Sequence, residues 1–215
     1  EGLRRAAETA HLAAATVARA LEAMDYRLAS KEFFDTLEVE AEAAVVQSLA
    51  LEQGINFYYP SEGRVRMSFD EVTTPAEIEA VAGIFAAAKG KKAKAVKAVA
   101  ESCIPAGLRR ESGYLLEPVF NAYRSESALM RYIKKLELRD ISLANSMISL
   151  GSCTMKLNAA ALMQPLSLAG FQNMHPFAPA DQAKGYMDLI AGLEQDLATI
   201  TGFAACSLQP NSGAA

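Results

Sequence analysis

The sequence predicts an α/β protein, with an α+β arrangement in the stretch that carries most of its regular elements. Three observations support this fold class. Apolar residues recur at alternating steps of four and three from Leu3 to Met24, which is one face of a helix about six turns long. Residues 55–59 and 65–69 are apolar at alternate positions, as in strands buried on one face. Thr74-Pro75-Ala76-Glu77 combines a capping hydroxyl, a first-turn proline and a reciprocating carboxylate, so it begins another helix.

The elements between these landmarks follow in order. Phe33, Leu37 and Val39 suggest a strand, and a helix is expected over 43–52, ending near Gly54. Ser61-Glu62-Gly63 is the turn of a hairpin that joins strands 55–59 and 65–69. The order helix, then β-α-β-β-α, predicts a small layer in which helices cover one face of a sheet.

The rest of the chain is expected to be helix and loop. The lysine- and alanine-rich residues 89–97 are typical of a solvated surface helix, and residues 104–121 of a linker. Ser125 caps the next helix, and Asp181 caps a later helix that has an apolar stripe from Tyr186 to Ile200 and is closed by Gly202. Residues 203–208 are expected to form a short buried strand. We expect His11, which lies beside the first apolar stripe, to be a core or boundary residue.

Composition excludes several classes of protein. The formal charge of −4 gives no general attraction to nucleic acid or an anionic membrane, and no apolar run approaches the roughly 20 residues that span a bilayer. The 3 cysteines are too few for a disulfide framework, which favours a reducing compartment. The chain opens on Glu1-Gly2 and closes on a turn, so we expect an internal fragment of a longer protein.

The chemistry-bearing stretch is Leu150-Gly151-Ser152-Cys153-Thr154-Met155-Lys156-Leu157-Asn158. Its apolar residues follow neither the helical nor the strand period, so it is expected to be a loop that presents small polar groups. Residues 173–179 and 209–215 have the same character. The turn Asn211-Ser212-Gly213-Ala214 follows the predicted strand 203–208, and its backbone N–H groups and hydroxyl would suit a phosphate.

Lys156 and Cys153 have alternative interpretations at this stage. A desolvated lysine can attack a carbonyl, and a cysteine becomes a nucleophile when a base removes its proton. No histidine adjoins Cys153 in the sequence, although His175 could approach it in the fold. No metal-ligating pattern is present.

The loop just described and several other strings closely resemble one family. They are residues 149–158, His175-Pro176-Phe177-Ala178-Pro179 with Gln182 and Gly185-Tyr186, residues 207–214, Pro118-Val119-Phe120-Asn121-Ala122-Tyr123-Arg124-Ser125-Glu126, and Leu129-Met130-Arg131-Tyr132. Together they resemble the pyridoxal-phosphate glycine decarboxylases, the P-proteins of the glycine cleavage system. Ser149, Leu162 and the string 167–171 depart from the usual pattern, but none of these departures removes a polar group with a chemical role.

The resemblance implies a pyridoxal-phosphate-dependent transferase fold of type I. Residues 1–98 would be the small α+β domain that ends the amino-terminal half, and 99–140 a linker with a helix. Residues 141–215 would start the large carboxy-terminal domain that binds pyridoxal phosphate. The family's Schiff-base lysine lies downstream of the Asn-Ser-Gly turn, so the isolated fragment is expected to be inactive and Lys156 not to be that lysine.

The resemblance also implies a reaction and its site. Glycine would release CO2 and pass its aminomethyl group to the lipoyl arm of H-protein. A homodimer of the full-length chain is expected, in the cytoplasm of a bacterium or the mitochondrion of a eukaryote, with the bacterial source favoured. The implied catalytic residues are Ser152, Cys153, Thr154 and His175, and the implied cofactor-binding residues are Asn211, Ser212, Gly213 and Ala214.

Two other functions remain open from the residues alone. The β-α-β-β-α region is also typical of a ferredoxin-like regulatory domain that binds a ligand, although that interpretation leaves residues 150–215 unexplained. The chain could equally be an interaction fragment without activity of its own.

Overall fold

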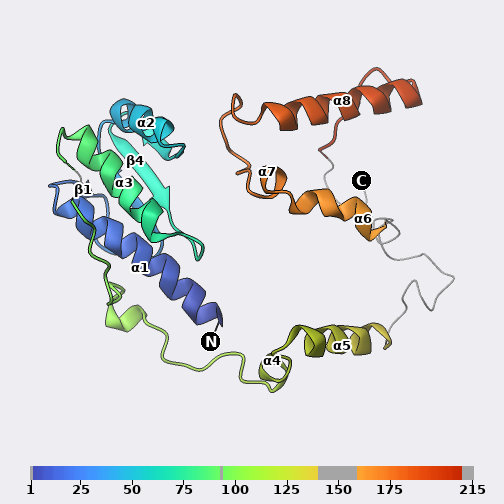
Figure 1. Cartoon of the computed structure of the whole chain (residues 1–215), viewed down its shortest axis with the longest axis horizontal. Coiled ribbons are helices and arrows are strands. Elements are labelled where there is room, and N and C mark those ends of the chain that lie inside the picture. Colours follow the sequence, from blue (N-terminus) through green and yellow to red (C-terminus); the bar gives the residue numbers. More distant parts are fainter. Residues whose placement is uncertain (1, 93, 140–158, 210–215) are drawn as a thin grey trace. The chain divides into compact units, whose positions relative to one another are not determined.

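The computed structural model describes residues 2–92, 94–139 and 159–209 (Figure 1). The chain divides into two units, Glu1–Ser112 and Gly113–Ala215. The first unit contains a sheet packed against helices, and the described part of the second contains helices and turns. This confirms a mixed α and β protein with a small antiparallel sheet. None of the described helices is long and apolar enough to cross a membrane.

The first unit is built on a four-stranded antiparallel sheet in the order β1-β2-β4-β3. Its elements along the chain are α1 (Gly2–Glu22), β1 (Arg27–Leu28), β2 (Thr36–Glu40), α2 (Ala43–Glu52), β3 (Tyr58–Ser61), β4 (Arg64–Ser68) and α3 (Pro75–Ala88). Strands β2 and β3 both pair antiparallel with the central β4, so they run parallel to each other with α2 between them in the chain. This is the split β-α-β arrangement of ferredoxin-like folds.

One face of this sheet holds the core of the unit. Leu37 pairs with Met67 and Val39 with Val65, and all four side chains are buried. Helices α1 and α3 pack side by side, and α2 packs on α3 (Figure 1). The side chains of this core from the helices include Ala14, Val17, Leu21, Val46, Ala50, Val81, Ile84 and Phe85. The predicted covering of one sheet face by helices is therefore confirmed. The predicted first helix is confirmed as α1, and its buried residues begin at Ala10, whereas Leu3 in the first turn is exposed.

The other sheet face is polar and meets solvent. Glu38 on β2 accepts hydrogen bonds from Arg64 and Arg66 on β4, with the Arg66 Nε at 2.9 Å. The Arg66 guanidinium also lies over the Tyr58 ring, 5.4 Å from its centroid. These hydrogen bonds, from Arg66 first and then Arg64, hold the pKa of the Glu38 carboxyl below its usual value.

Neither edge of the sheet offers a long free strand. Strand β1 has only two residues, and it was not predicted because two residues carry no detectable alternation. Strand β3 contains Pro60, and its register shifts between Tyr58 and Ser61. The predicted strands were therefore too long: Phe33 lies before β2, and β3 begins at Tyr58 rather than at Ile55.

Helix α3 starts and stops at local signals. The Thr74 hydroxyl accepts from the Glu77 backbone N–H, and the Glu77 carboxylate accepts from the Thr74 N–H at 2.6 Å, which confirms the predicted cap. These bonds to Thr74 also lower the pKa of Glu77. At the other end, Gly90 has φ 64°, and Lys91 N–H donates to Ala86 C=O while Gly90 N–H donates to Ala87 C=O. This is a Schellman motif, which ends the helix at Ala88.

The predicted surface helix over 89–97 is consequently wrong. Residues 91–92 and 94–100 have no helical structure. Lys89 Nζ instead donates to the Met24 and Asp25 carbonyls at 2.8 and 2.7 Å, where α1 has ended. The Val99 backbone N–H donates to Thr16 Oγ1 on α1 at 3.0 Å. After Gly90 the chain is held by bonds to α1 and its end, so alanine content was a misleading signal.

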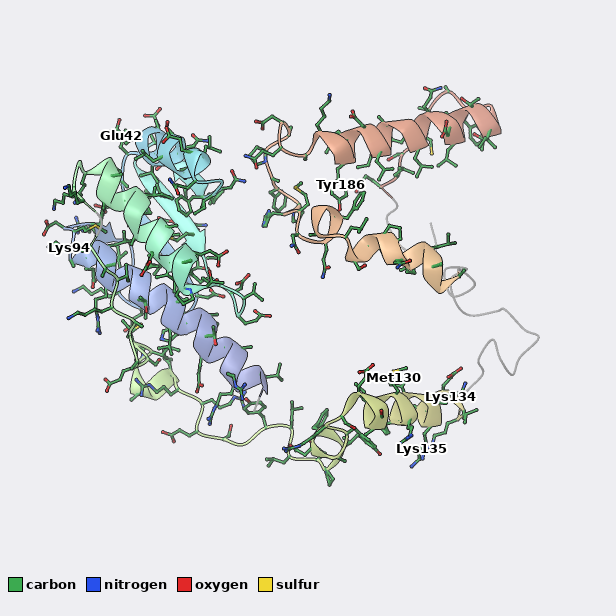
Figure 2. All side chains as sticks on the ribbon, viewed as in Figure 1. Glu42, Lys94, Met130, Lys134, Lys135 and Tyr186 are labelled. Carbon is green, nitrogen blue, oxygen red and sulfur yellow. The ribbon has the colours of Figure 1, made fainter. Side chains whose placement is uncertain are left out.

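The described part of the second unit is much less buried. It comprises α4 (Val119–Ala122), α5 (Glu126–Glu137), α6 (Ala160–Met163), the 3-10 turn η3 (Gln164–Ser167), α7 (Ala169–Gln172) and α8 (Lys184–Thr201). Ser125 Oγ caps α5 by accepting from Ala128 N–H at 3.2 Å, as predicted. Figure 2 shows Met130, Lys134 and Lys135 projecting from this helix, and Met130 is 60% exposed. Among the described residues of this unit, Ala183 is the one that is buried.

Two predictions in the second unit are corrected. Ala183, not Asp181, is the cap position of α8, and no side chain there accepts a hydrogen bond. The turns at 179–183 displace Asp181 from the helix start. Residues 203–208 are not a strand, because no described segment pairs with them, and Phe203 is 72% exposed. Gly202 does close α8, with φ 73°.

Two tyrosines of the first unit provide a matched test of core hydrogen bonding. Tyr26 Oη donates to the Phe85 carbonyl at 2.8 Å in the core, whereas the buried Tyr59 Oη has no acceptor for its hydrogen among the described residues. We expect Tyr26→Phe to lower the free energy of unfolding by about 1–2 kcal/mol, because it leaves a buried carbonyl unpaired. Tyr59→Phe should leave it unchanged or raise it. Urea unfolding of both variants measures this, and equal losses would contradict the assignment.

Acid titration tests the polar sheet face. Because the folded-state pKa of Glu38 is lowered, its stabilising contribution is complete above the ordinary glutamate pKa and is lost as pH falls through the folded value. The melting temperature of Glu38→Gln should therefore be lower than that of the parent near neutral pH. The difference should disappear below about pH 4.3. Glu79→Gln, on the exposed side of α3, is the control that removes the same charge. A difference in melting temperature between Glu38→Gln and the parent that does not change with pH would show that the ionised Glu38 carboxylate does not stabilise the fold.

Candidate functional site

Most of the predicted site lies outside the described residues. This holds for Ser152, Cys153 and Thr154, for Lys156, and for the predicted phosphate turn Asn211, Ser212, Gly213 and Ala214. Their expected roles stay predictions. His175 is the predicted site residue that the structure describes.

His175 begins a tight turn that fixes its ring. The Ala178 N–H donates to the His175 carbonyl at 3.0 Å, and Pro176 occupies the second position of the turn, where its fixed φ is favourable. The Phe177 backbone N–H donates to His175 Nδ1 at 3.0 Å. Nδ1 is therefore an acceptor, so the hydrogen of the neutral imidazole is on Nε2. The turn presents a ring with a defined tautomer and a donor at Nε2.

The surroundings of His175 are open. His175 is exposed, and its neighbour Phe177 is 89% exposed, with the two rings tilted at a centroid distance of 5.9 Å. An exposed imidazole held by backbone bonds can donate one hydrogen bond and offer a flat face to another ring. It has no described carboxylate or thiol partner with which to act as a general base.

Tyr186 holds the segment that follows this turn. Its hydroxyl donates to the Phe171 carbonyl of α7 at 2.6 Å, and the two rings meet edge to face at 5.5 Å (Figure 2). The residues between Phe171 and Tyr186 therefore form a loop whose two ends are joined, and His175 belongs to this loop. Tyr186 was quoted from the sequence only as part of a family string and a helix stripe, and its role in closing this loop was not predicted.

A similar closure follows α8. The chain reverses at Gly202, and the Leu208 N–H donates to Glu194 Oε1 on α8 at 3.3 Å. The strand expected here is absent, but residues 203–208 do run back along the helix. The segment that leads to the predicted phosphate turn is thus attached to α8.

The upstream family string also forms a local structure. The rings of Tyr123 and Tyr132 stack at a centroid distance of 4.0 Å, which joins the middle of α5 to the residue after α4. Arg124 donates from Nε to the Asn121 carbonyl and from Nη2 to Asn121 Oδ1, each at 3.1 Å. These aromatic and guanidinium groups were not predicted as site residues, and the sequence offered only the string itself as a signal.

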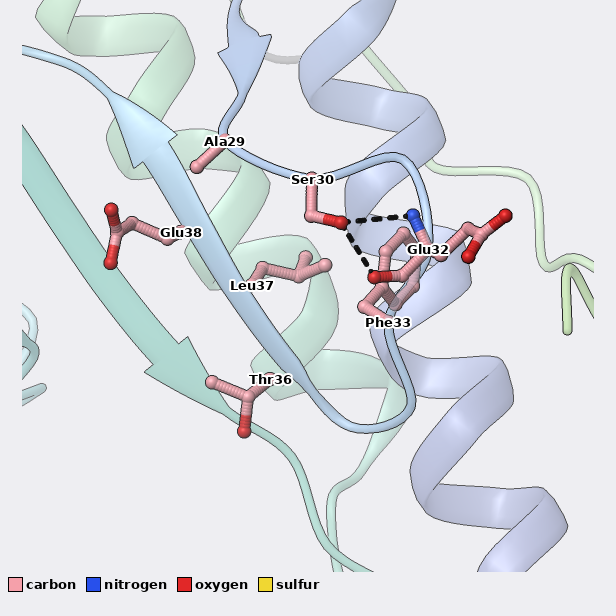
Figure 3. Close-up of a pocket in the computed structure, with 7 residues that line it drawn as sticks. All are labelled: Ala29, Ser30, Glu32, Phe33, Thr36, Leu37 and Glu38. Carbon is pink, nitrogen blue, oxygen red and sulfur yellow. Dashed lines mark hydrogen bonds between the residues drawn. The ribbon is translucent and has the colours of Figure 1, made fainter.

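The described residues of the first unit form shallow pockets, and none of the predicted site residues lies in this unit. The pocket in Figure 3 lies beside β2 and has a volume of about 290 Å³. Its lining residues include Ser30, Glu32, Phe33 and Thr36. Ser30 Oγ is occupied by its own turn, accepting from the Glu32 N–H at 3.2 Å and donating to the Glu32 carbonyl at 2.8 Å. The described residues contain no group of histidine, cysteine or carboxylate side chains that would hold a metal ion.

His11 is buried, as predicted, but its partners were not foreseen. Its Nδ1 lies 2.7 Å from the Phe34 carbonyl, and its Nε2 lies 2.9 Å from Ser102 Oγ and 3.6 Å from Cys103 Sγ. Because these partners are more than twenty residues from His11 in the sequence, no local pattern indicates them.

Removing the Tyr186 hydroxyl tests whether the His175 loop depends on it. We expect Tyr186→Phe to speed amide hydrogen exchange at Ala178 and Gln182 about fivefold, since one hydrogen bond is worth about 1 kcal/mol. The ring contact with Phe171 is retained in this variant. Tyr132→Phe makes the same change on α5 and should leave these amides unaffected. Equal exchange in the parent and Tyr186→Phe would show that the loop is held by other contacts.

Known proteins match both units of the chain. Residues 1–85 match the family model of the glycine cleavage system P-protein. The glycine dehydrogenase (decarboxylating) of Flavobacterium johnsoniae is 48% identical over 215 residues, and that of Christiangramia forsetii is 46% identical over 215. That of Chromobacterium violaceum is 45% identical over 217 residues. Each match covers 100% of this chain but only 22–23% of the relative, so the chain spans less than a quarter of these proteins.

Proposed function

We propose that this chain is part of a pyridoxal-phosphate-dependent glycine decarboxylase, because residues 1–85 match the glycine cleavage system P-protein family and the whole chain resembles glycine dehydrogenases (decarboxylating). The enzyme would release CO2 from glycine and transfer the aminomethyl group to the lipoyl arm of H-protein. The observation that carries this proposal is the 48% identity to a glycine dehydrogenase (decarboxylating) over all 215 residues, through both units.

The finer architecture belongs to the same proposal. Residues 1–98 would be the small domain that ends the amino-terminal half of a type I pyridoxal-phosphate enzyme, 99–140 a linker, and 141–215 the start of the large domain. The self-contained core of the first unit supports the small domain. The exposed apolar side chains of α5 and α8 support a larger domain in which further structure covers them.

His175 is the residue on which the fit of the cofactor can be judged. Its imidazole is exposed, is fixed by the Phe177 N–H, and presents a flat face with an Nε2 donor. These properties suit a planar aromatic cofactor such as pyridoxal phosphate, which supplies an electron sink when it is bound. His175 would pack against the cofactor ring and orient it.

The other predicted residues would bind substrate and phosphate. Ser152 and Thr154 flank Cys153, so in an extended loop both hydroxyls face the same way and would hold the glycine carboxylate. Backbone N–H groups of Asn211, Gly213 and Ala214, with the Ser212 hydroxyl, would hold the cofactor phosphate. The attachment of residue 208 to α8 supports this, because it would limit where the phosphate turn can lie.

The cellular setting is proposed from the relatives. Glycine and lipoylated H-protein would be the partners, and the full-length chain would form a homodimer. The relatives named above come from bacteria, which supports a bacterial enzyme of the cytoplasm. The first unit does have the ferredoxin-like strand arrangement of the regulatory alternative. A shared fold does not establish a shared function, and that alternative leaves the matched strings of the second unit unexplained.

The proposal is tested in a full-length enzyme that carries this segment. Ser152→Ala and Thr154→Ala should each leave the thermal melt nearly unchanged, because a loop hydroxyl contributes only about 1 kcal/mol. Each should lower glycine–bicarbonate exchange in the presence of H-protein about tenfold, since the carboxylate loses its positioning contacts. Full exchange in both variants would exclude the loop from the site.

Lys156→Ala distinguishes a supporting lysine from the Schiff-base lysine. We expect turnover to fall while the cofactor stays covalently attached, as shown by its visible spectrum and by trapping with borohydride. Leu162→Ala is a suitable control, because it changes an exposed side chain outside the predicted loop. Loss of the covalent cofactor in Lys156→Ala alone would overturn the assignment.

A further inference from the structure

The buried His11 and the exposed Cys103 form a nucleophile and base pair that the proposed decarboxylation does not use. His11 is 2% exposed and lies in the middle of α1. Cys103 follows Ser102 in the chain, and its Sγ lies 3.6 Å from His11 Nε2. Cys103 itself is exposed, so the sulfur is on the solvent side of the pair.

The tautomer of His11 is defined by its partners. The Phe34 carbonyl can only accept, so the hydrogen of the neutral ring is on Nδ1, which lies 2.7 Å away. The Cys103 backbone N–H can only donate, and it points to Nε2 at 3.2 Å. The lone pair of the imidazole is therefore at Nε2, where it faces the Cys103 N–H, the Ser102 hydroxyl and the Cys103 thiol. This is the order nucleophile, base and orienting acceptor that activated thiols share.

The ring of His11 is shielded on its other sides. It stacks on Phe34 at 5.8 Å with an interplanar angle of 7°, and it meets Phe33 at 6.2 Å. The imidazole is thus shielded from water and held in one orientation. Its described contacts at Nε2 come from the polar loop at 102–104. A base in such a position keeps its orientation toward the sulfur without competition from bulk water.

The loop that carries Cys103 is held in place and lies near a positive charge. Ser102 Oγ accepts from the Ile104 N–H at 3.1 Å and lies 2.9 Å from His11 Nε2. Arg109 donates from Nε to the Ile104 carbonyl at 2.8 Å and from Nη2 to the Ser102 carbonyl at 3.0 Å. Its guanidinium thus bonds the carbonyls of the residues before and after Cys103. A thiol becomes a nucleophile when a neighbouring base removes its proton, and this loop holds Cys103 beside His11 Nε2.

We propose that Cys103 is a reactive thiol, activated by His11, that forms mixed disulfides with small disulfide compounds. His11 Nε2 takes the proton from Sγ, and the thiolate attacks one sulfur of the compound. The new bond joins Cys103 Sγ to that sulfur while the original S–S bond breaks. The released thiolate takes a proton, so Cys103–SH and R–S–S–R give Cys103–S–S–R and R–SH. The Cys103 sulfur is oxidised and the leaving sulfur is reduced.

Labelling of the 215-residue chain with oxidised glutathione tests the proposal. Peptide mapping by mass spectrometry gives the rate at each cysteine near neutral pH, in buffer and in concentrated urea. We expect Cys103 in the folded chain to react about tenfold faster than in urea, and faster than the partly buried Cys206. A folded rate at or below the urea rate would overturn the proposal.

Two variants show whether the named partners are responsible. His11→Gln should reduce the folded rate at Cys103 to the rate in urea, with circular dichroism confirming the fold. If that variant does not fold, Arg109→Gln decides, because Arg109 is an exposed residue and its replacement should slow Cys103 about threefold. Arg27→Gln removes the same charge from β1 and should leave the rate unchanged. An unchanged rate in folded His11→Gln, or in Arg109→Gln where it decides, refutes the mechanism.

Discussion

The first unit depends on burying one face of a very small sheet. Leu37, Val39, Val65 and Met67 give that face its apolar surface, and α1 and α3 remove it from water. Phe85 on α3 is the largest fully buried side chain, and Tyr26 bonds its carbonyl. Because only one face is covered, the opposite face carries the charges of Glu38, Arg64 and Arg66, and buried residues alternate with more exposed ones along β2 and β4. Every other feature of the unit, including the loop at 102–104, is attached to this packed layer.

The second unit, in its described part, shows what happens without such a layer. Its helices are held by local bonds, such as that of Tyr186 to Phe171 and that of residue 208 to Glu194. The apolar side chains of α8 are exposed, with Leu189 at 57% and Ile200 at 80%. Local hydrogen bonds define turns and caps, but they do not bury apolar surface. The helices near the proposed site are thus formed by local hydrogen bonds, while their apolar side chains stay exposed.

Sequence reasoning succeeded where the physical cause is local. The Thr74 and Ser125 caps, the Gly202 helix end and the helix Ala43–Glu52 were all predicted, because each depends on residues within one turn. It failed where the cause is distant. The surface helix over 89–97 is prevented by the Schellman motif at Gly90 and by bonds to α1, and the predicted strand 203–208 has no described partner.

The same division explains the candidate site. The matching strings indicated which segments carry chemistry, and for His175 the structure adds a tautomer and a fixed turn. The contact between His11 and Cys103 joins residues 92 apart in the sequence, so no spacing rule could have indicated it. Seven of the eight predicted site residues lie outside the described part of the chain, and their roles rest on the proposal.

The edges of the sheet have a consequence for association. A strand from another molecule can extend a sheet only where an edge offers a row of free N–H and C=O groups. Here one edge is the two-residue β1, and the other contains Pro60 and an irregular register. Both edges therefore resist strand addition, which protects the unit from the edge-to-edge pairing that leads to cross-β aggregates. Any lasting association of this unit must use its side chains.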